Sequence, residues 1–322
     1  GMRVAMLMST SAGNDVMFDE TLCEQGRNFC NKIWNAYRLV NMWAVDSNVE
    51  QPEAARQAIA WFDEVMLERI DRISHDMDQY RISEAFTELY RLFWDDFSGW
   101  YLEMVKPAYQ APIDPTTLAK TKDYFDQLLR LLHPFMPFVT EEIWQDLNAE
   151  SEAVSIVIAN MPVAERKADE KVLGRFELAM EIITAIRNIR KQKNIAQKET
   201  LALNYIADEN YPAEYEAVIA KMGNLKEVAE VVEKDATAAA FIVKTTQYFV
   251  PMEGNIDKEA EIKKLTADLE YYEGFLNSVM KKLSNERFVS SAPEKVVANE
   301  RAKQADAEAK IAAIKAQIEA LK

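Results

Sequence analysis

Apolar residues in the first 150 positions recur at the three- and four-residue steps that are typical of amphipathic helices. Prolines interrupt this pattern at 107, 112, 115, 134 and 137, where proline is expected to end a helix. Thr140 precedes Glu141 and Glu142 and is expected to cap the last helix. The pattern therefore predicts a helical bundle, with helices over roughly 20–45, 53–78, 80–106, 116–132 and 140–148.

The next hundred residues change character. A helical pattern over about 165–193 is followed by short runs of the β-branched and aromatic residues that favour strands. These runs cover 201–207, 227–232, 239–244 and 247–250, with a short helix near 212–221. Together they predict a small α/β connector.

The last segment has a heptad pattern. Apolar residues recur in alternating steps of three and four from Ile262 to Leu283, and the pattern resumes from Val297 to Leu321. We expect two helices, each roughly 40 Å long, joined by a turn at 284–292 into an antiparallel coiled-coil hairpin. Glu300 and Gln304 place polar side chains in its seam. A parallel dimer of two chains is the alternative, because heptads alone do not choose between the two.

The predicted fold is therefore mainly α. Its expected parts are a linking segment (1–20), a helical bundle (21–160), a small α/β connector (161–255) and a coiled-coil arm (256–322). The 322 residues are enough for two or three domains with cores of their own. Cys23 and Cys30 cannot form a disulfide framework, which favours a reducing cytoplasm.

The net charge of −15 argues against nucleic acid as a partner when it is taken as a total. The distribution of charge changes this picture. Residues 257–322 hold 12 basic and 12 acidic side chains, so the first 256 residues carry the whole of −15. Residues 182–198 contain five basic and no acidic side chains. This run is interpreted as a phosphate contact, with a solvated helix end as the alternative.

The helix over 20–45 carries the most specific candidate surface. Three cations and three amides fall in one arc of its helical wheel, and no acidic residue interrupts them. Because amides read base edges and cations hold phosphates, this arc is a candidate RNA-reading surface. The alternative is that the amides cap neighbouring loops. The arc consists of Arg27, Asn28, Asn31, Lys32, Asn35 and Arg38.

Other chemistry is weakly indicated. Trp34 is placed on the apolar side of the same helix, as a core residue. The aromatic stripe of the helix over 80–106 is also assigned to the core, although bases could stack on it. His75 and His133 lack partners at metal-ligand spacing, so neither a metal site nor a catalytic site is expected.

Several segments resemble the class I aminoacyl-tRNA synthetases. The string GRNFCNKIWNAYRLV (26–40) resembles the opening helix of the anticodon-binding domain in the valine, isoleucine and leucine families. Residues 93–107 and 128–147 resemble two further blocks of that domain, and 13–19 resemble the stretch after the catalytic domain of the valine family. Residues 281–303 resemble the C-terminal coiled coil of the valine–tRNA ligase family, which the other two families lack.

The resemblance implies that the bundle reads the anticodon of valine tRNA and that the arm contacts the outer corner of the tRNA. Lys281, Lys282, Arg287 and Lys295 are the candidate contacts of the arm, beside Arg187, Arg190, Lys191 and Lys193 of the basic run. The parent enzyme would attach valine to its tRNA with ATP and Mg²⁺. Neither class I signature, HIGH or KMSKS, occurs in this sequence. The two histidines do not begin a HIGH string, because His75 is followed by Asp76 and His133 by Pro134. The fragment is therefore expected to hold no cofactor and to catalyse nothing.

As partners, the resemblance implies tRNA but neither DNA nor a membrane, and the chain is expected to be a cytoplasmic monomer. Two alternatives stay open from the sequence. One is the equivalent part of an isoleucine–tRNA ligase, which the lack of cysteines after Cys30 disfavours. The other is a non-enzymic helical scaffold that dimerises through its coiled coil.

Overall fold

The computed structural model describes residues 1–9, 20–149, 154–233, 238–252, 258–284 and 294–321. The chain forms two compact units, 1–176 and 177–322, and the division falls inside a helix. The four-part division expected from the sequence stays a prediction. Each unit is described by itself.

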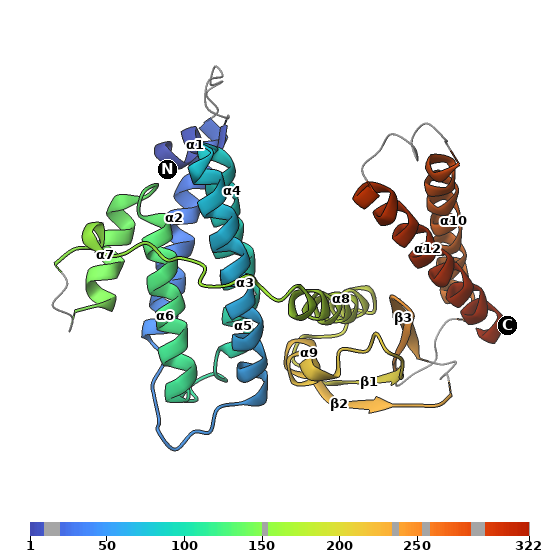
Figure 1. Ribbon diagram of the computed structural model, residues 1–322. Coiled ribbons are helices and arrows are strands. Elements are labelled where there is room, and N and C mark those ends of the chain that lie inside the picture. Colours follow the sequence, from blue (N-terminus) through green and yellow to red (C-terminus); the bar gives the residue numbers. More distant parts are fainter. Residues whose placement is uncertain (10–19, 150–153, 234–237, 253–257, 285–293, 322) are drawn as a thin grey trace. The chain divides into compact units, whose positions relative to one another are not determined.

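The first unit is the expected helical bundle, in which long helices run side by side (Figure 1). The bounds predicted for α3 are confirmed to the residue, whereas α2 ends four residues before the predicted end at 45. The helical elements of this unit are α1 (Met2–Ser9), α2 (Glu20–Asn41), α3 (Glu53–Asp78), α4 (Ile82–Arg91), the π-helix η1 (Leu92–Tyr101), α5 (Leu102–Val105), α6 (Pro115–Leu132), α7 (Pro137–Leu147) and the 3₁₀-helix η2 (Ile156–Ile158).

The helix expected over 80–106 is interrupted by a π-helical stretch. Its buried aromatic residues Phe93, Phe97 and Tyr101 follow one another at steady four-residue steps. That spacing is longer than the 3.6-residue repeat of an α-helix, and the wider π turn keeps all three rings on one side. All three are 0% exposed. Of the predicted stripe, Phe86, Leu89, Phe93, Phe97 and Met104 are buried and Trp100 is half-buried, so its assignment to the core is confirmed except at Trp100.

The aromatic core joins α3, η1 and α6. The ring of Phe62 on α3 lies 4.8 Å from both Tyr101 and Tyr124, and Phe97 lies 5.5 Å from Phe125, edge to face. The Tyr124 hydroxyl donates to Asp63 over 2.8 Å, which gives a buried phenol the partner it needs. These contacts fix the bundle on which α2 is held.

The expected cap at Thr140 is wrong. The helix α7 begins at Pro137, because proline is well suited to the first turn of a helix, where its missing N–H is not needed. Thr140 therefore lies one turn inside the helix. It is fully buried and its hydroxyl donates to the Met136 carbonyl over 2.9 Å.

The second unit contains a four-stranded mixed sheet in the order β2-β1-β4-β3. β1 pairs in parallel with β2 and antiparallel with β4, as Tyr205 opposite Tyr248 shows. The strands confirm the predicted α/β connector. Its elements are α8 (Glu170–Gln192), which begins in the first unit, β1 (Leu201–Ile206), the 3₁₀-helix η3 (Ala213–Tyr215), α9 (Glu216–Gly223), β2 (Leu225–Glu230), β3 (Ala239–Val243) and β4 (Thr246–Val250).

The arm consists of α10 (Lys258–Leu283) and α12 (Glu294–Leu321), which pack against each other. Lys282 pairs with Glu300, and Lys310 lies over the ring of Tyr272. The residue numbers of each pair sum to 582, which is the signature of antiparallel helices in one chain. The expected turn at 284–292 lies, apart from Ser284, outside the described residues.

Candidate RNA-binding surface

The helix α2 is anchored by one apolar face. Phe29 and Ile33 are fully buried and Tyr37 is 4% exposed. The ring of Phe29 lies edge to face with Phe86 and Phe93, and the Tyr37 hydroxyl donates to Asp146 on α7. Desolvation and this carboxylate raise the pKa of Tyr37. The opposite face of α2 is consequently held toward solvent in a fixed orientation.

That outer face carries the predicted polar arc. Arg27, Asn28, Asn31, Asn35 and Arg38 are exposed, and Lys32 is half-buried. Among the described residues, the three amides and Arg38 form no side-chain hydrogen bond or ion pair. The alternative in which the amides cap neighbouring loops therefore finds no contact in the described part of the chain.

The two remaining cations of the arc have neighbours. The amine of Lys32 lies 5.4 Å from the ring centroid of Trp94, and Arg27 pairs loosely with Glu24 at 3.9 Å. Both members of the Arg27 pair are about two-thirds exposed, so the pair is weak and easily exchanged for another anion. Glu20 and Glu24 are the acidic residues of α2, and both precede the arc.

The assignment of Trp34 to the core is wrong, because its side chain is 39% exposed. The helical periodicity of the sequence predicts that Trp34 lies outside the buried face. The buried residues Phe29, Ile33, Ala36, Tyr37 and Val40 define the inner face, and Trp34 lies about 60° beyond Tyr37 at 100° per residue. Residue type alone assigns such an aromatic residue to the apolar side, although it lies at the edge of the buried face.

The basic run at the end of α8 does not form one surface. Arg187, Lys191 and Lys193 are exposed, but Arg190 is only 2% exposed, so its assignment as a tRNA-backbone contact is wrong. Its guanidinium donates to the carbonyl oxygens of Ala196, Glu199, Gly223 and Asn224 at 2.7–3.2 Å. Arg190 follows the buried Ile186 by one helical turn, and this spacing places it on the inner face.

Two of the four candidate tRNA contacts of the arm have described side chains. Lys281 and Lys282 are exposed near the end of α10, and the amine of Lys282 is 3.6 Å from Glu300. Glu300 is 6% exposed in the seam and also pairs with Lys303 at 2.8 Å, which lowers the pKa of Glu300. Of the other two candidates, Arg287 lies outside the described residues, as does the side chain of Lys295.

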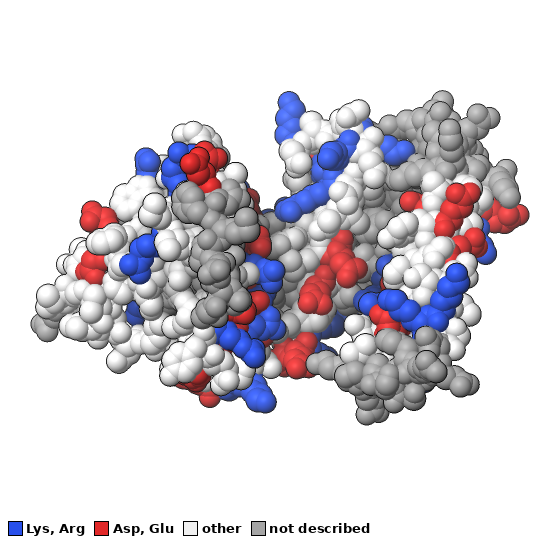
Figure 2. Space-filling view, turned by 90° about the horizontal axis from the view of Figure 1, so that it is seen from above, with Lys and Arg blue, Asp and Glu red and all other residues white. Residues whose placement is uncertain are grey.

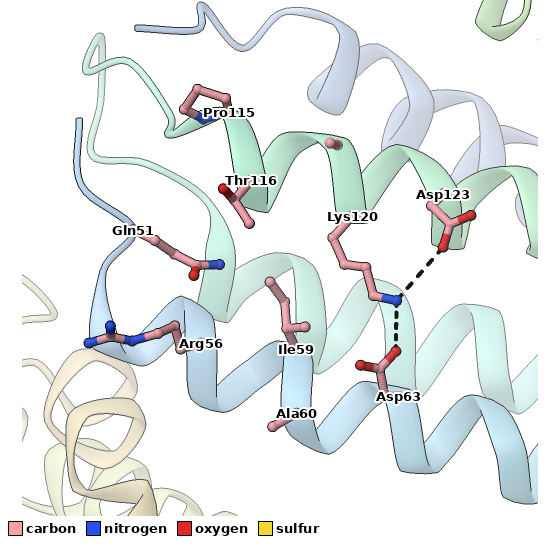
Figure 3. Close-up of a pocket in the computed structure, with 10 residues that line it drawn as sticks. Gln51, Arg56, Ile59, Ala60, Asp63, Pro115, Thr116, Lys120 and Asp123 are labelled. Atoms are coloured by element: carbon pink, nitrogen blue, oxygen red, sulfur yellow. Dashed lines mark ion pairs between the residues drawn. The ribbon is translucent and has the colours of Figure 1, made fainter. Parts of the chain in front are cut away.

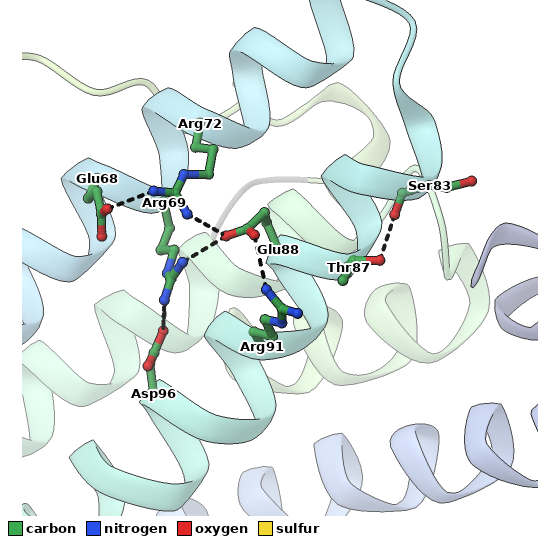
Figure 4. Close-up of polar contacts among 8 residues, drawn as sticks. All are labelled: Glu68, Arg69, Arg72, Ser83, Thr87, Glu88, Arg91 and Asp96. Atoms are coloured by element: carbon green, nitrogen blue, oxygen red, sulfur yellow. Dashed lines mark hydrogen bonds and ion pairs between the residues drawn. The ribbon is translucent and has the colours of Figure 1, made fainter. Parts of the chain in front are cut away.

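A charged network at α3 and α4 serves the fold (Figure 4). The carboxylate of Glu88 accepts from Arg69 at 2.7 Å, from Arg72 at 3.2 Å and from Arg91 at 3.5 Å. Arg69 also pairs with Asp96. Burial raises the pKa of the Asp96 carboxyl to about 6, although the Arg69 guanidinium acts to lower it. The paired charges tie α3 to α4 and η1.

An open groove of about 820 Å³ lies between the first turns of α3 and α6 (Figure 3). Its cations are already paired. Lys120 contacts Asp63 at 2.9 Å and Asp123 at 3.8 Å, and Arg56 contacts Glu53. The groove is therefore a poorer candidate for phosphate binding than the α2 surface.

On the face seen in Figure 2, basic and acidic side chains are interspersed in small groups. In the described residues, no group of three His, Cys, Asp or Glu side chains could hold a metal ion. The described helices are also too short or too polar to cross a membrane. Among the described residues of the arc on α2, Arg38 and Lys32 form no ion pair with an acidic side chain.

The amino-acid sequence matches known protein families. Residues 60–206 match the family described as the anticodon-binding domain of tRNA ligase, and residues 257–322 match the valyl tRNA synthetase tRNA binding arm. The chain therefore belongs to the tRNA ligases, of which it carries an anticodon-binding domain.

The arm narrows this class to the valine–tRNA ligase family, and curated relatives agree. A protein of Parabacteroides distasonis named Valine--tRNA ligase is 50% identical over 321 residues, which is all of this chain and 36% of that protein. Proteins of the same name from Christiangramia forsetii and Listeria innocua are 48% and 36% identical over all of this chain, which covers 36% and 38% of them. The chain thus spans about a third of these relatives.

Proposed function

We propose that this chain is the tRNA-binding part of a valine–tRNA ligase and that the exposed arc of α2 contacts the anticodon. The observation that carries the proposal is an exposed surface of cations and amides in a chain of net charge −15. Among the described residues its amides have no side-chain partner, and its acidic neighbour Glu24 pairs only loosely with Arg27. The matched anticodon-binding domain begins at residue 60, so α2 precedes it, within the region shared by the curated relatives.

The parent ligase would attach valine to its tRNA with ATP. The sites for ATP, Mg²⁺ and valine would lie in a part of the ligase outside this chain. This chain would contribute tRNA binding, act as a monomer and work in the cytoplasm. The monomer is supported by the arm, whose helices pair within one chain through Lys282 and Glu300.

The arm would supply a second contact, far along the tRNA from the anticodon. Its exposed cations Lys281 and Lys282 support this role. Deletion of 257–322 is then expected to weaken binding of full-length valine tRNA and to spare binding of an isolated anticodon stem-loop. Equal losses for both RNAs would assign the arm to stability instead.

The test of the α2 surface is a titration of the chain with valine tRNA, isoleucine tRNA and the valine anticodon stem-loop. Binding of valine tRNA should weaken in each of the variants Asn31→Ala, Asn35→Ala and Arg38→Ala. Their free energy of unfolding should change by no more than about 0.5 kcal/mol, as is usual for exposed positions. Arg38→Ala should also lower the salt dependence by about one phosphate contact, which the Asn variants should not do.

Lys167→Ala is the matched control, because Lys167 is an exposed cation in another segment of the first unit. It should leave affinity for the stem-loop unchanged. Variants of α2 that melt earlier but bind normally would show a structural role for the arc and contradict the proposal.

A further inference from the structure

An exposed tryptophan lies at the edge of the polar arc of α2. Trp34 is 39% exposed, whereas the other aromatic residues of the helix, Phe29 and Tyr37, are 0% and 4% exposed. At 100° per residue, Trp34 lies about 20° from Arg27 and about 40° from Arg38 on the helix surface. One turn away along the helix its neighbours are Cys30, Asn31, Tyr37 and Arg38, and Arg27 lies two turns away on the same side.

The ring of Trp34 is also sparsely engaged by the protein. Its described ring contact is Tyr37, at a centroid distance of 6.1 Å and an angle of 50°. In the described part of the chain its N–H has no hydrogen-bond partner. By contrast, Trp144 donates to Asp126 over 2.7 Å, and Trp61 stacks on Phe176 at 4.2 Å.

We infer that Trp34 stacks on one unpaired base of the RNA loop that α2 contacts, an inference that rests on the proposed function. Single-stranded loops are recognised by stacking splayed bases on aromatic side chains, while cations hold the adjacent phosphates. Trp34 supplies the ring, Arg38 supplies a cation one turn along the helix, and Arg27 supplies a second cation two turns away in the other direction.

The size and surroundings of the ring favour a base over a protein partner. The aromatic neighbour of Trp34, Tyr37, is 4% exposed, and Arg38 lies one turn away, whereas a protein interface has a contiguous apolar centre depleted of charge. Asp146 of α7 borders this edge of the helix, and its carboxylate already accepts from the Tyr37 hydroxyl.

The test compares Trp34→Leu and Trp34→Phe in the full chain, with the valine anticodon stem-loop as the RNA. Leucine keeps an apolar side chain but cannot stack, so affinity should fall roughly 5- to 150-fold, the range expected for one base stacked on one aromatic ring. Phenylalanine should retain most of the affinity. Phe138→Leu is the control, because Phe138 is an 82% exposed aromatic residue on α7.

A set of stem-loops, each with a single abasic position in the loop, then identifies the base. At one position the abasic RNA should bind wild type more weakly, and Trp34→Leu should cause no further loss there, because both changes remove the same contact. Penalties that simply multiply at every position would overturn the inference.

Three other results would overturn it or its basis. Trp34→Leu could bind as tightly as wild type while Asn31→Ala and Arg38→Ala bind weakly, which would retain the proposed function and reject the stacking. Trp34→Leu could lower the melting temperature as much as Phe29→Leu, a truncation of a fully buried ring, and Trp34 would then be a packing residue. A wild-type chain that does not bind the stem-loop would reject both proposals.

Discussion

Arg190 holds the end of α8 against the loop that precedes β1 and the turn that precedes β2. Its guanidinium is 2% exposed and donates to four carbonyl oxygens, and the shortest contact is 2.7 Å to Glu199. Replacement of Arg190 by methionine keeps the hydrocarbon stem and removes every donor. The carbonyl oxygen of Gly223, in a hydrogen bond that is fully buried, would lose its partner.

The loss of stability in Arg190→Met depends on which of the four carbonyl oxygens water can hydrate once the guanidinium is removed. Ala196 and Glu199 are exposed residues, so solvent can replace the guanidinium there. The contacts to Gly223 and Asn224, at 2.9 and 3.1 Å, are less accessible. At about 1.5–3 kcal/mol for each hydrogen bond to a charged group, their loss should cost about 3–5 kcal/mol of unfolding free energy.

The distribution of tryptophan makes the effect measurable for one unit at a time. All six tryptophans lie between 34 and 144, hence in the first unit. The second unit has 146 residues (322 − 176), for which about 3–5 kcal/mol corresponds to a fall in melting temperature of roughly 6–20 °C. Arg190→Met should lower the transition seen by far-ultraviolet circular dichroism for this unit and leave the tryptophan-fluorescence transition in place.

Lys191→Met is the control, because it removes the same charge from the neighbouring, exposed position. It should melt like wild type. Arg190→Lys should recover only part of the loss, since an ammonium group cannot reach four carbonyls as a planar guanidinium does. The reasoning is refuted if Arg190→Met and Lys191→Met have the same melting temperature and weaken tRNA binding equally.

Three further predictions concern single side chains. Burial raises the pKa of Asp96 to about 6 from an unfolded value of about 3.9, so this group contributes stability at low pH that is lost as pH rises through 6. The difference, at most about 3 kcal/mol, should be absent in Asp96→Asn when tryptophan-monitored unfolding is compared at pH 4 and 7. The pKa of Glu300 is lowered by Lys303 and Lys282, so its stabilisation of the arm is present at neutral pH and lost as pH falls through the folded pKa. The helical signal of Glu300→Gln should therefore depend less on pH between 7 and 3 than that of wild type. Gly26→Ala should lower the melting temperature of the first unit, because a methyl group there would lie 2.9 Å from the Val4 Cβ. Gly174→Ala, which meets nothing within 4 Å, should not lower it.

The sequence by itself determined the order and type of the elements. The alternation of apolar and polar residues located α3 at its observed bounds and separated the helical bundle, the α/β connector and the two arm helices. These features depend on local periodicity, which any amphipathic segment displays before it finds a partner. The arc on α2 also came from periodicity, because its inner and outer faces differ in composition along one turn.

The tertiary structure decided the role of residues whose type and position conflict. Arg190 and Lys191 are adjacent cations in one basic run, yet only Arg190 donates to carbonyl oxygens of both the following loop and the turn at Gly223, 33 residues away. Trp34 is of an aromatic type that favours the core, yet it lies at the edge of the buried face of α2 and is left 39% exposed. The antiparallel packing of α10 on α12 within the chain is likewise not contained in the heptad pattern, which fits a hairpin and a dimer equally well. In each instance the outcome depends on which segment, far away in the chain, arrives beside the residue, and this information is absent from the local pattern.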